Sequence, residues 1–192
     1  VSLFDHLKTT AAIAVSLYDW QKGEKAGDEP FLMIGGDFSG IQSYIYNIIS
    51  ENAAKNLKGR SFYLKLLSDS VVMFLLKELE LYEANIIYNS GGSFFILAPN
   101  TTKVIEKLKE VEKTIENRIF ETHGTSLYVA IANVPLSRNA LMGLQGERIG
   151  KCWEELFRLR DNHKKCRYTK RLVKDYSLFF EPGEAGGLTA RD

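Results

Sequence analysis

The sequence NIIYNSGGSFFIL, residues 85–97, contains two β-prone runs on either side of a polar segment with two glycines. The runs are residues 85–88 and 94–97, and the segment between them reads Asn-Ser-Gly-Gly-Ser. Glycine adopts the positive φ values that tight turns need, so this pattern predicts a β-hairpin. Pro99 then ends the second strand, because proline lacks the N–H group that strand pairing uses.

Upstream of the hairpin, the apolar run at residues 31–34 indicates a buried central strand that ends within the next four residues. A helix is expected directly afterwards, because Ser39 and Gln42 have the spacing of a capping box, with Ser39 as the N-cap. The polar residues 56–60 should interrupt this helix. A second helix, deeply buried, should then occupy residues 61–81.

Downstream of the hairpin, the sequence predicts a surface helix at residues 101–122, ended by Gly124. Its apolar face is formed by Val104, Leu108, Val111, Ile115 and Ile119. Alternating apolar residues then predict a last strand at residues 126–134. Two helical segments flank this core, an amphipathic one at residues 2–20 and a basic one at residues 146–175.

The resulting order is strand, helix pair, strand, strand, helix, strand. We therefore expect an α+β fold, a ferredoxin-like βαββαβ domain flanked by helical segments. In such a sheet the first strand is antiparallel to the second strand of the hairpin. Asp37, after the first strand, should consequently lie beside residues 90–93.

The composition fits a soluble globular protein, with 45% hydrophobic and 26% charged residues and a formal net charge of +1. The longest apolar stretch, residues 71–76, is too short to span a membrane. Two cysteines, Cys152 and Cys166, predict free thiols in a cytoplasmic protein rather than a disulfide framework or a zinc ribbon. A start without methionine or signal peptide and a glycine-rich stretch at residues 181–187 suggest part of a longer intracellular protein.

A carboxylate, a glycine turn and a helix N-terminus are expected to converge at one edge of the sheet. Free N–H groups and a carboxylate together suit a phosphate and a divalent cation. Each feature also has a structural explanation, since Asp37 before Ser39 is typical of helix capping and Gly91-Gly92 of turn geometry. Both explanations remain open for each residue.

This arrangement resembles the palm domains of nucleotidyl cyclases and GGDEF-type proteins. Their hairpin carries Gly-Gly followed by acidic residues, which bind two metal ions and a nucleoside triphosphate. In this sequence, Ser93 and Phe94 follow Gly91-Gly92. Because neither can bind a hard cation as a carboxylate does, we do not expect the chain to act as a stand-alone nucleotidyl cyclase.

A closer resemblance is to the large signature subunit of type III-A (Csm) CRISPR effector complexes. It is carried, in order, by SLFDH (residues 2–6), TTAAIA (9–14), GDFSGIQ (36–42), KGRSFYL (58–64) and SGGSF (90–94). It implies that residues 1–23 are the terminal helix of an upstream HD nuclease domain. Residues 30–136 would form the first palm, a degenerate GGDEF-like domain, and residues 137–192 a basic helical segment that starts a linker to a following domain.

By this resemblance the chain is a non-catalytic palm of an antiviral complex. It would bind ATP jointly with a second palm that makes cyclic oligoadenylate when target RNA is recognised. The ATP-binding residues would be Asp37, Phe38, Ser39, Gly40, Ser90, Gly91, Gly92 and Ser93. Mg²⁺ or Mn²⁺ would act in the parent protein, with Asp37 either touching the metal or capping its helix, and no zinc is expected here.

The expected partners are ATP, other effector subunits, and guide and target RNA, with no membrane. Residues 151–174 contain nine basic and three acidic residues, which indicates either a solvated helix face or a contact with RNA or another subunit. The candidates for such a contact are Arg60, Lys164, Lys165, Arg167, Lys170 and Arg171. Asp5 and His6 are weaker candidates for a role in the HD nuclease.

One further alternative is an RNA-binding module, because RNA-recognition domains share this topology. Phe94 and Phe95 are aromatic residues on the third strand, where such domains stack bases. The accompanying glycine and aromatic pattern is absent from the sequence. The palm therefore remains the favoured interpretation.

Overall fold

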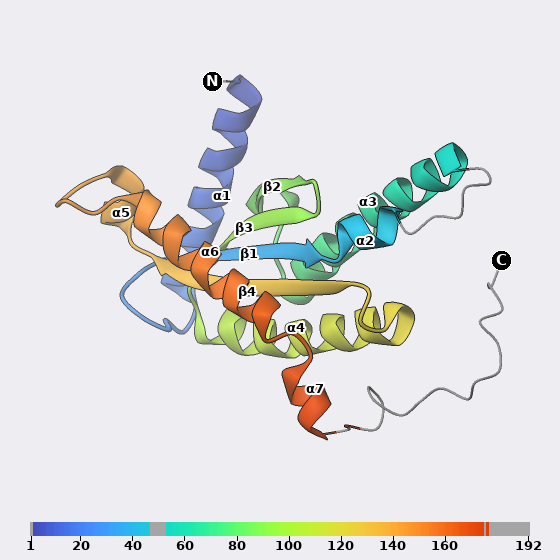
Figure 1. Cartoon of the computed structure of the whole chain (residues 1–192). Coiled ribbons are helices and arrows are strands. Elements are labelled where there is room, and N and C mark those ends of the chain that lie inside the picture. The colour runs from blue at the N-terminus through green and yellow to red at the C-terminus, as the bar shows by residue number, and fades with distance from the viewer. Residues whose placement is uncertain (1, 47–52, 175, 177–192) are drawn as a thin grey trace.

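The computed structural model describes residues 2–46, 53–174 and 176. Its centre is a four-stranded, fully antiparallel sheet with the order β2-β3-β1-β4 (Figure 1). The strands are β1 (Phe31–Ser39), β2 (Ile86–Ser90), β3 (Ser93–Pro99) and β4 (Tyr128–Leu136). The predicted order of elements and the pairing of the first strand with the second strand of the hairpin are confirmed.

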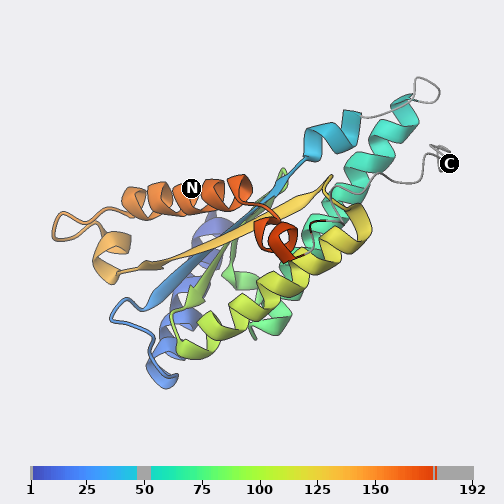
Figure 2. The same ribbon diagram turned by 60° about the horizontal axis from the view of Figure 1, so that its bottom comes forward.

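Helices cover both faces of the sheet. They are α1 (Leu3–Lys22), α2 (Ile41–Tyr46), α3 (Ala53–Glu78), α4 (Thr102–His123), α5 (Arg138–Met142), α6 (Ile149–Lys165), α7 (Thr169–Lys174) and a 3-10 helix, η1 (Glu83–Asn85). Helices α3 and α4 pack on one face, whereas α1 and α6 pack on the other (Figures 1 and 2). Within the described ranges, no helix is both long and apolar enough to cross a membrane.

Strand β1 is buried on both sides, as its apolar sequence predicted. Leu32 and Ile34 join the core beneath α3 and α4. Phe31 and Met33 join the second core, beneath α1 and α6. Successive side chains of a strand point to opposite faces, so one short run supplies both cores.

The first strand is longer than the sequence indicated, because it continues through Gly35 and Gly36 to Ser39. Both glycines are required by close packing inside the sheet. A Cβ atom at Gly36 would lie 2.0 Å from Cζ of Phe94, and one at Gly35 would lie 2.9 Å from Cδ2 of Leu156. These glycines therefore extend the strand and do not end it.

The predicted N-cap at Ser39 is wrong. Ser39 is the last residue of β1 and pairs with Tyr128. The chain turns at Gly40, which has a φ of 92° and whose carbonyl oxygen accepts a hydrogen bond from the Tyr44 N–H at 2.9 Å. Helix α2 accordingly begins one residue later, at Ile41.

The predicted interruption at residues 56–60 is also wrong, since α3 passes through this segment without a break. A single glycine inside a helix costs only about 1 kcal/mol, which the neighbouring contacts offset. One such contact comes from Arg60, whose guanidinium donates to the Tyr44 carbonyl at 2.6 Å and so ties α3 to α2.

The predicted hairpin is confirmed, with strands somewhat longer than expected. Its two-residue turn is Gly91-Gly92, and the φ angles are 63° and 84°. Two positive φ values are what a type I′ turn requires. The predicted basic helix at residues 146–175 divides into α6 and α7, and the glycine-rich stretch at residues 181–187 lies outside the described residues.

Candidate functional site

The carboxyl end of β1 lies beside the hairpin turn. Asp37 is directly opposite Ser93 in the β1–β3 register. The Phe38 N–H donates to the carbonyl oxygen of Gly92 at 2.9 Å. Although these residues are far apart in the sequence, the structure brings them together as the topology predicted. We call this region the β1–hairpin edge.

Asp37 has two partners at this edge. One carboxylate oxygen accepts a hydrogen bond from the Ser93 hydroxyl, and the other forms an ion pair with the Lys164 ammonium of α6. The side chains of Asp37 and Lys164 are 17% and 27% exposed. Asp37 therefore does not cap a helix, and its nearest cation is a lysine from a distant part of the chain.

The candidate nucleotide-binding residues are divided between the two faces of the sheet. Asp37 and Ser93 lie on the face that α6 covers, and Ser90 shares this face because it is paired with Ser93. Phe38 is on the opposite face and is buried in the core under α3. A phosphate bound beside Asp37 would consequently meet the backbone of Phe38 rather than its ring.

A cavity of about 190 Å³ lies under the hairpin turn on the α3 side. Its walls combine apolar side chains, including Ile41 and Leu64, with residues of the turn itself. Its rim is built by α3 and β2, because Asn89 donates to Asp69 at 2.9 Å and Lys65 contacts the same carboxylate at 2.5 Å. This network fixes the hairpin to α3, and sequence patterns gave no indication of it.

The other face carries a stripe of aromatic and basic side chains that the sequence interpretation missed. Trp153, Phe157, Arg160 and Lys164 recur at helical spacing along α6. The Phe95 and Trp153 ring centroids are 4.7 Å apart, and the Arg160 guanidinium is 4.9 Å from the Phe157 centroid. This spacing was the signal that could have revealed the stripe. The stripe ends at Lys164, which contacts Asp37.

The other basic candidates for RNA or subunit contact do not gather with Lys164. Arg171 donates to the Asn117 side chain, and its guanidinium is 4.3 Å from the Phe120 centroid. Lys170 lines a cavity against α4. Lys165 and Arg167 are exposed. Their proposed contacts stay predictions.

Asp5 and His6 are exposed on the part of α1 that projects beyond the sheet (Figure 1). In the part of the chain that the structure describes, no group of three or more His, Cys, Asp or Glu side chains could hold a metal ion. The association of Asp5 and His6 with a nuclease stays a prediction.

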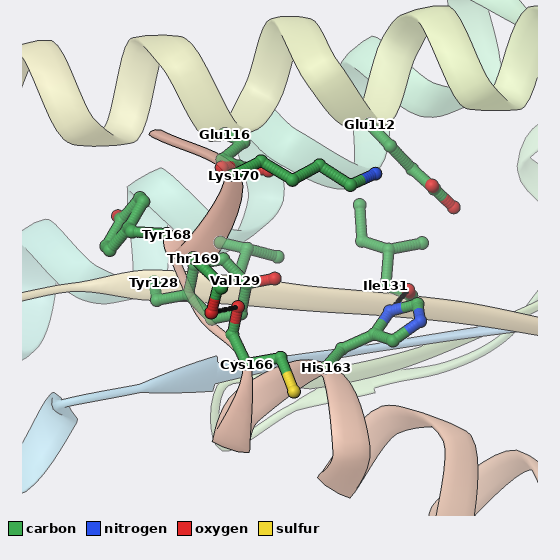
Figure 3. A pocket seen from close by; sticks show the side chains of 10 residues that line it. All are labelled: Glu112, Glu116, Tyr128, Val129, Ile131, His163, Cys166, Tyr168, Thr169 and Lys170. Atoms are coloured by element: carbon green, nitrogen blue, oxygen red, sulfur yellow. Dashed lines mark hydrogen bonds between the residues drawn. The ribbon is translucent and has the colours of Figure 1, made fainter. Parts of the chain in front are cut away.

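A second cavity, of about 250 Å³, opens between α4, β4 and the α6–α7 connection (Figure 3). Glu112 reaches into it from α4, and His163 from α6, where its Nδ1 lies 2.6 Å from the Ile131 carbonyl oxygen. Burial raises the pKa of Glu112 to about 7, and nearby Glu116 adds to this effect. Lys109 and Lys170 partly oppose the increase.

Glu112 is expected to make the stability of the domain dependent on pH. Its pKa rises from 4.5 to about 7 on folding, so the folded state holds this proton more tightly, and stability is lost as the pH rises through that window. At a pH well above 7, Glu112→Gln should therefore raise the free energy of unfolding by on the order of 2–3 kcal/mol. Urea unfolding across this range measures the effect.

The matched control for this measurement is Glu110→Gln, which removes an exposed carboxylate from the same helix. It should leave the pH profile close to that of the unmodified chain. An equal response of both variants would contradict the assignment of the pH dependence to Glu112.

Comparison with known proteins identifies the family. The family model for Csm1 subunit domain B matches residues 30–182. Among curated proteins, a relative from Thermococcus onnurineus is 36% identical over 144 residues, covering 71% of this chain and 18% of the relative. One from Streptococcus thermophilus is 39% identical over 145 residues, covering 68% and 19%. Both are described as CRISPR system single-strand-specific deoxyribonucleases Cas10/Csm1 of subtype III-A.

Solved structures agree with the sequence comparisons. A crystal structure of the Csm1–Csm4 cassette with one ATP matches with a TM-score of 0.80 and 32% identity, covering 93% of this chain and 25% of that one. The cassette with cA4 matches with a TM-score of 0.79 and 33% identity, covering 93% and 25%. The chain thus spans about a fifth to a quarter of the length of its relatives. It belongs to the family of Csm1 subunit domain B, from the Cas10/Csm1 proteins of type III-A CRISPR systems.

Proposed function

We propose that this chain is a non-catalytic palm that binds the phosphates of ATP at the β1–hairpin edge. A second palm would supply the metal-binding carboxylates and make cyclic oligoadenylate when target RNA is recognised. The observation that carries this proposal is the set of contacts made by Asp37 at this edge. Asp37 is held there by Ser93 and Lys164, directly beside a glycine turn.

The residues after the glycine turn support a non-catalytic role. The Ser93 hydroxyl already donates to Asp37. Phe94 is completely buried, with its ring against the backbone of Gly36. Two-metal catalysis needs carboxylates that bridge the attacking and leaving oxygens, and neither residue provides one. A stand-alone nucleotidyl cyclase is therefore the weaker alternative.

Ligands and partners of the relatives support the nucleotide and the assembly. Crystal structures of the Csm1–Csm4 cassette contain one ATP, AMPPNP, cA3 or cA4. We infer that this chain likewise contributes to a nucleotide site in a Csm1 subunit that assembles with Csm4. Contacts with guide and target RNA would come through the complex, in the cytoplasm, and would involve the exposed Lys165 and Arg167.

We propose the same domain organisation that the motifs implied. Residues 1–23 would be the last helix of an HD nuclease domain, and its packing is consistent with this. Buried Ala12 packs with strand residues in the core beneath α1 and α6, whereas Leu3 and Phe4 are about 70% exposed and free to contact another domain. Residues 30–136 would be the first palm, and residues 137–192 the start of the following segment.

An RNA-recognition role for the sheet is less well supported. Such modules stack bases on aromatic rings of an open sheet face. Phe94 is fully buried, and Phe95 is packed edge-on against Trp153 of α6. The observed packing of α6 against β1 and β4 leaves these rings unsuited to that mode.

The residues of this edge do not fit Mg²⁺ or Mn²⁺. Asp37 is the carboxylate that the edge provides, and an ammonium already contacts it. A divalent ion prefers several oxygen ligands and is repelled by a neighbouring cation. We therefore assign any catalytic metal to the second palm and describe no step through a metal at this edge.

Titration with ATP is expected to shift backbone NMR signals of the β1–hairpin edge. The largest changes should occur at Asp37, Gly40, Gly91 and Ser93, with weak affinity because half of the joint site is missing. The measurement is a ¹H–¹⁵N correlation spectrum of the labelled chain at increasing ATP. Shifts restricted to the cavity around Glu112 would contradict the proposed location of the nucleotide.

A further inference from the structure

The contact between Lys164 and Asp37 suggests how this edge binds phosphate without a metal. We propose that Lys164 is the resident cation of the β1–hairpin edge, that its ammonium contacts the nucleotide phosphate, and that binding there is consequently independent of divalent ions. This inference rests on the proposed nucleotide site. It identifies the group that neutralises the phosphate, and it makes Asp37 the anion that pairs with this group when no phosphate is bound.

The fold delivers Lys164 to a fixed place. Helix α6 is anchored beneath the sheet by Leu156, which is fully buried, and by Cys152. The last turn of the helix is held by His163, whose Nδ1 lies 2.6 Å from the Ile131 carbonyl oxygen. Lys164 follows directly, so its side chain extends from a well-supported turn towards Asp37.

Lys164 offsets the repulsion that Asp37 would exert on an anion. A lone Asp37 carboxylate would repel a phosphate, whereas the ion pair is neutral overall. An ammonium has three N–H donors, and the contact with Asp37 engages one of them. The next acid, Asp161, is 3.8 Å from the ammonium. The Lys164 side chain is 27% exposed, so a phosphate can reach the other N–H donors of the ammonium.

The same geometry argues against a metal at Asp37. The Lys164 ammonium contacts one carboxylate oxygen of Asp37 and occupies the position where a divalent ion would bind. The other carboxylate oxygen accepts from Ser93. Among the described residues, no cluster of three metal-ligating side chains includes this position.

Opposite effects of two substitutions test the inference. ATP binding to the chain is measured by NMR titration, with Mg²⁺ and separately with EDTA. Lys164→Met should weaken ATP binding about tenfold, the loss of one charge-assisted hydrogen bond. Asp37→Asn should maintain or tighten binding, because it releases the ammonium from a competing anion. Lys164→Arg, which retains the cation, should stay within about threefold of the unmodified chain.

Three results would overturn the inference. Binding that requires Mg²⁺ and is lost in Asp37→Asn would make Asp37 a metal ligand, and the proposed nucleotide site would still stand. Unchanged ATP affinity in Lys164→Met, with reduced stability in urea, would make the ion pair purely structural. No ATP binding by the unmodified chain would overturn the proposed nucleotide site as well. Supporting evidence would be a shift of the Lys164 side-chain ammonium signal when ATP is added.

Discussion

Replacing Gly40 with alanine is expected to destabilise the domain by at least about 3 kcal/mol, because two separate penalties combine. Gly40 has a φ of 92°, a conformation that residues with a Cβ atom rarely adopt. A Cβ atom there would also lie 1.9 Å from the backbone oxygen of Ser126. Neither the last residues of β1 nor the chain before β4 can move without breaking the pairing of Ser39 with Tyr128.

Two other glycines separate these penalties. Gly91 has a φ of 63° with open space around it, so Gly91→Ala should cost only the conformational strain, about 1 kcal/mol. Gly59 lies inside α3, also with open space, so Gly59→Ala should stabilise by about 0.5–1 kcal/mol. Urea unfolding of the three variants gives the comparison. If Gly40→Ala cost no more than Gly91→Ala, the steric conflict with Ser126 would be refuted.

The sequence predicted the elements whose signals are local. The hairpin could be identified because its two glycines lie between β-prone runs, and they take the positive φ values of the turn. Helix α4 could be identified because Val104, Leu108 and Val111 recur at helical spacing, and all three are buried. In both cases the information lies within a few neighbouring residues.

The sequence was misleading where tertiary packing overrides local preference. Gly35 and Gly36 suggested the end of a strand, but they lie inside it because Phe94 and Leu156 fill the space above and below the backbone. Residues 56–60 suggested a helix break, but the helix continues. Nothing in the neighbouring residues encodes such contacts, which form only when distant elements meet.

For the candidate site, too, the sequence predicted one part and missed the part that depends on tertiary packing. Topology alone predicted that Asp37 lies near the glycine turn, and the register confirms it. Topology could not predict Lys164, because the orientation of α6 on the sheet decides which of its basic residues meets Asp37. Nor did it separate Asp37 from Phe38, whose side chains point to opposite faces. The approximate location of the candidate site therefore followed from strand order, whereas its ion pair depends on the packing of α6.

Gly92→Asp is expected to reduce cyclic oligoadenylate synthesis at least about tenfold in a full-length Csm1 subunit that carries this domain. The Gly92 carbonyl accepts from the Phe38 N–H at 2.9 Å, so this residue is part of the β1–hairpin edge. A side chain at Gly92 would project towards Ile41 and Phe38, on the α3 side of the turn. Its carboxylate would therefore lie across the turn from Asp37, and its negative charge would repel the ATP phosphates over that distance at a partly buried site. The measurement is product formation from ATP with target RNA present.

Gly92→Asn separates the charge from the shape of the new side chain, since Asn and Asp have nearly the same size. Both variants bear the strain of a φ of 84°, and both bring a Cβ atom within 2.4 Å of Cδ1 of Ile41. The Ile41 side chain can move, and Asn tolerates positive φ better than most residues, so Gly92→Asn should retain more synthesis than Gly92→Asp. Equal losses in both variants, together with equal losses of stability in urea, would mean that the turn is sensitive to shape alone. The proposed position of the nucleotide phosphates near the turn would then be contradicted, because a charge added to this edge should weaken their binding.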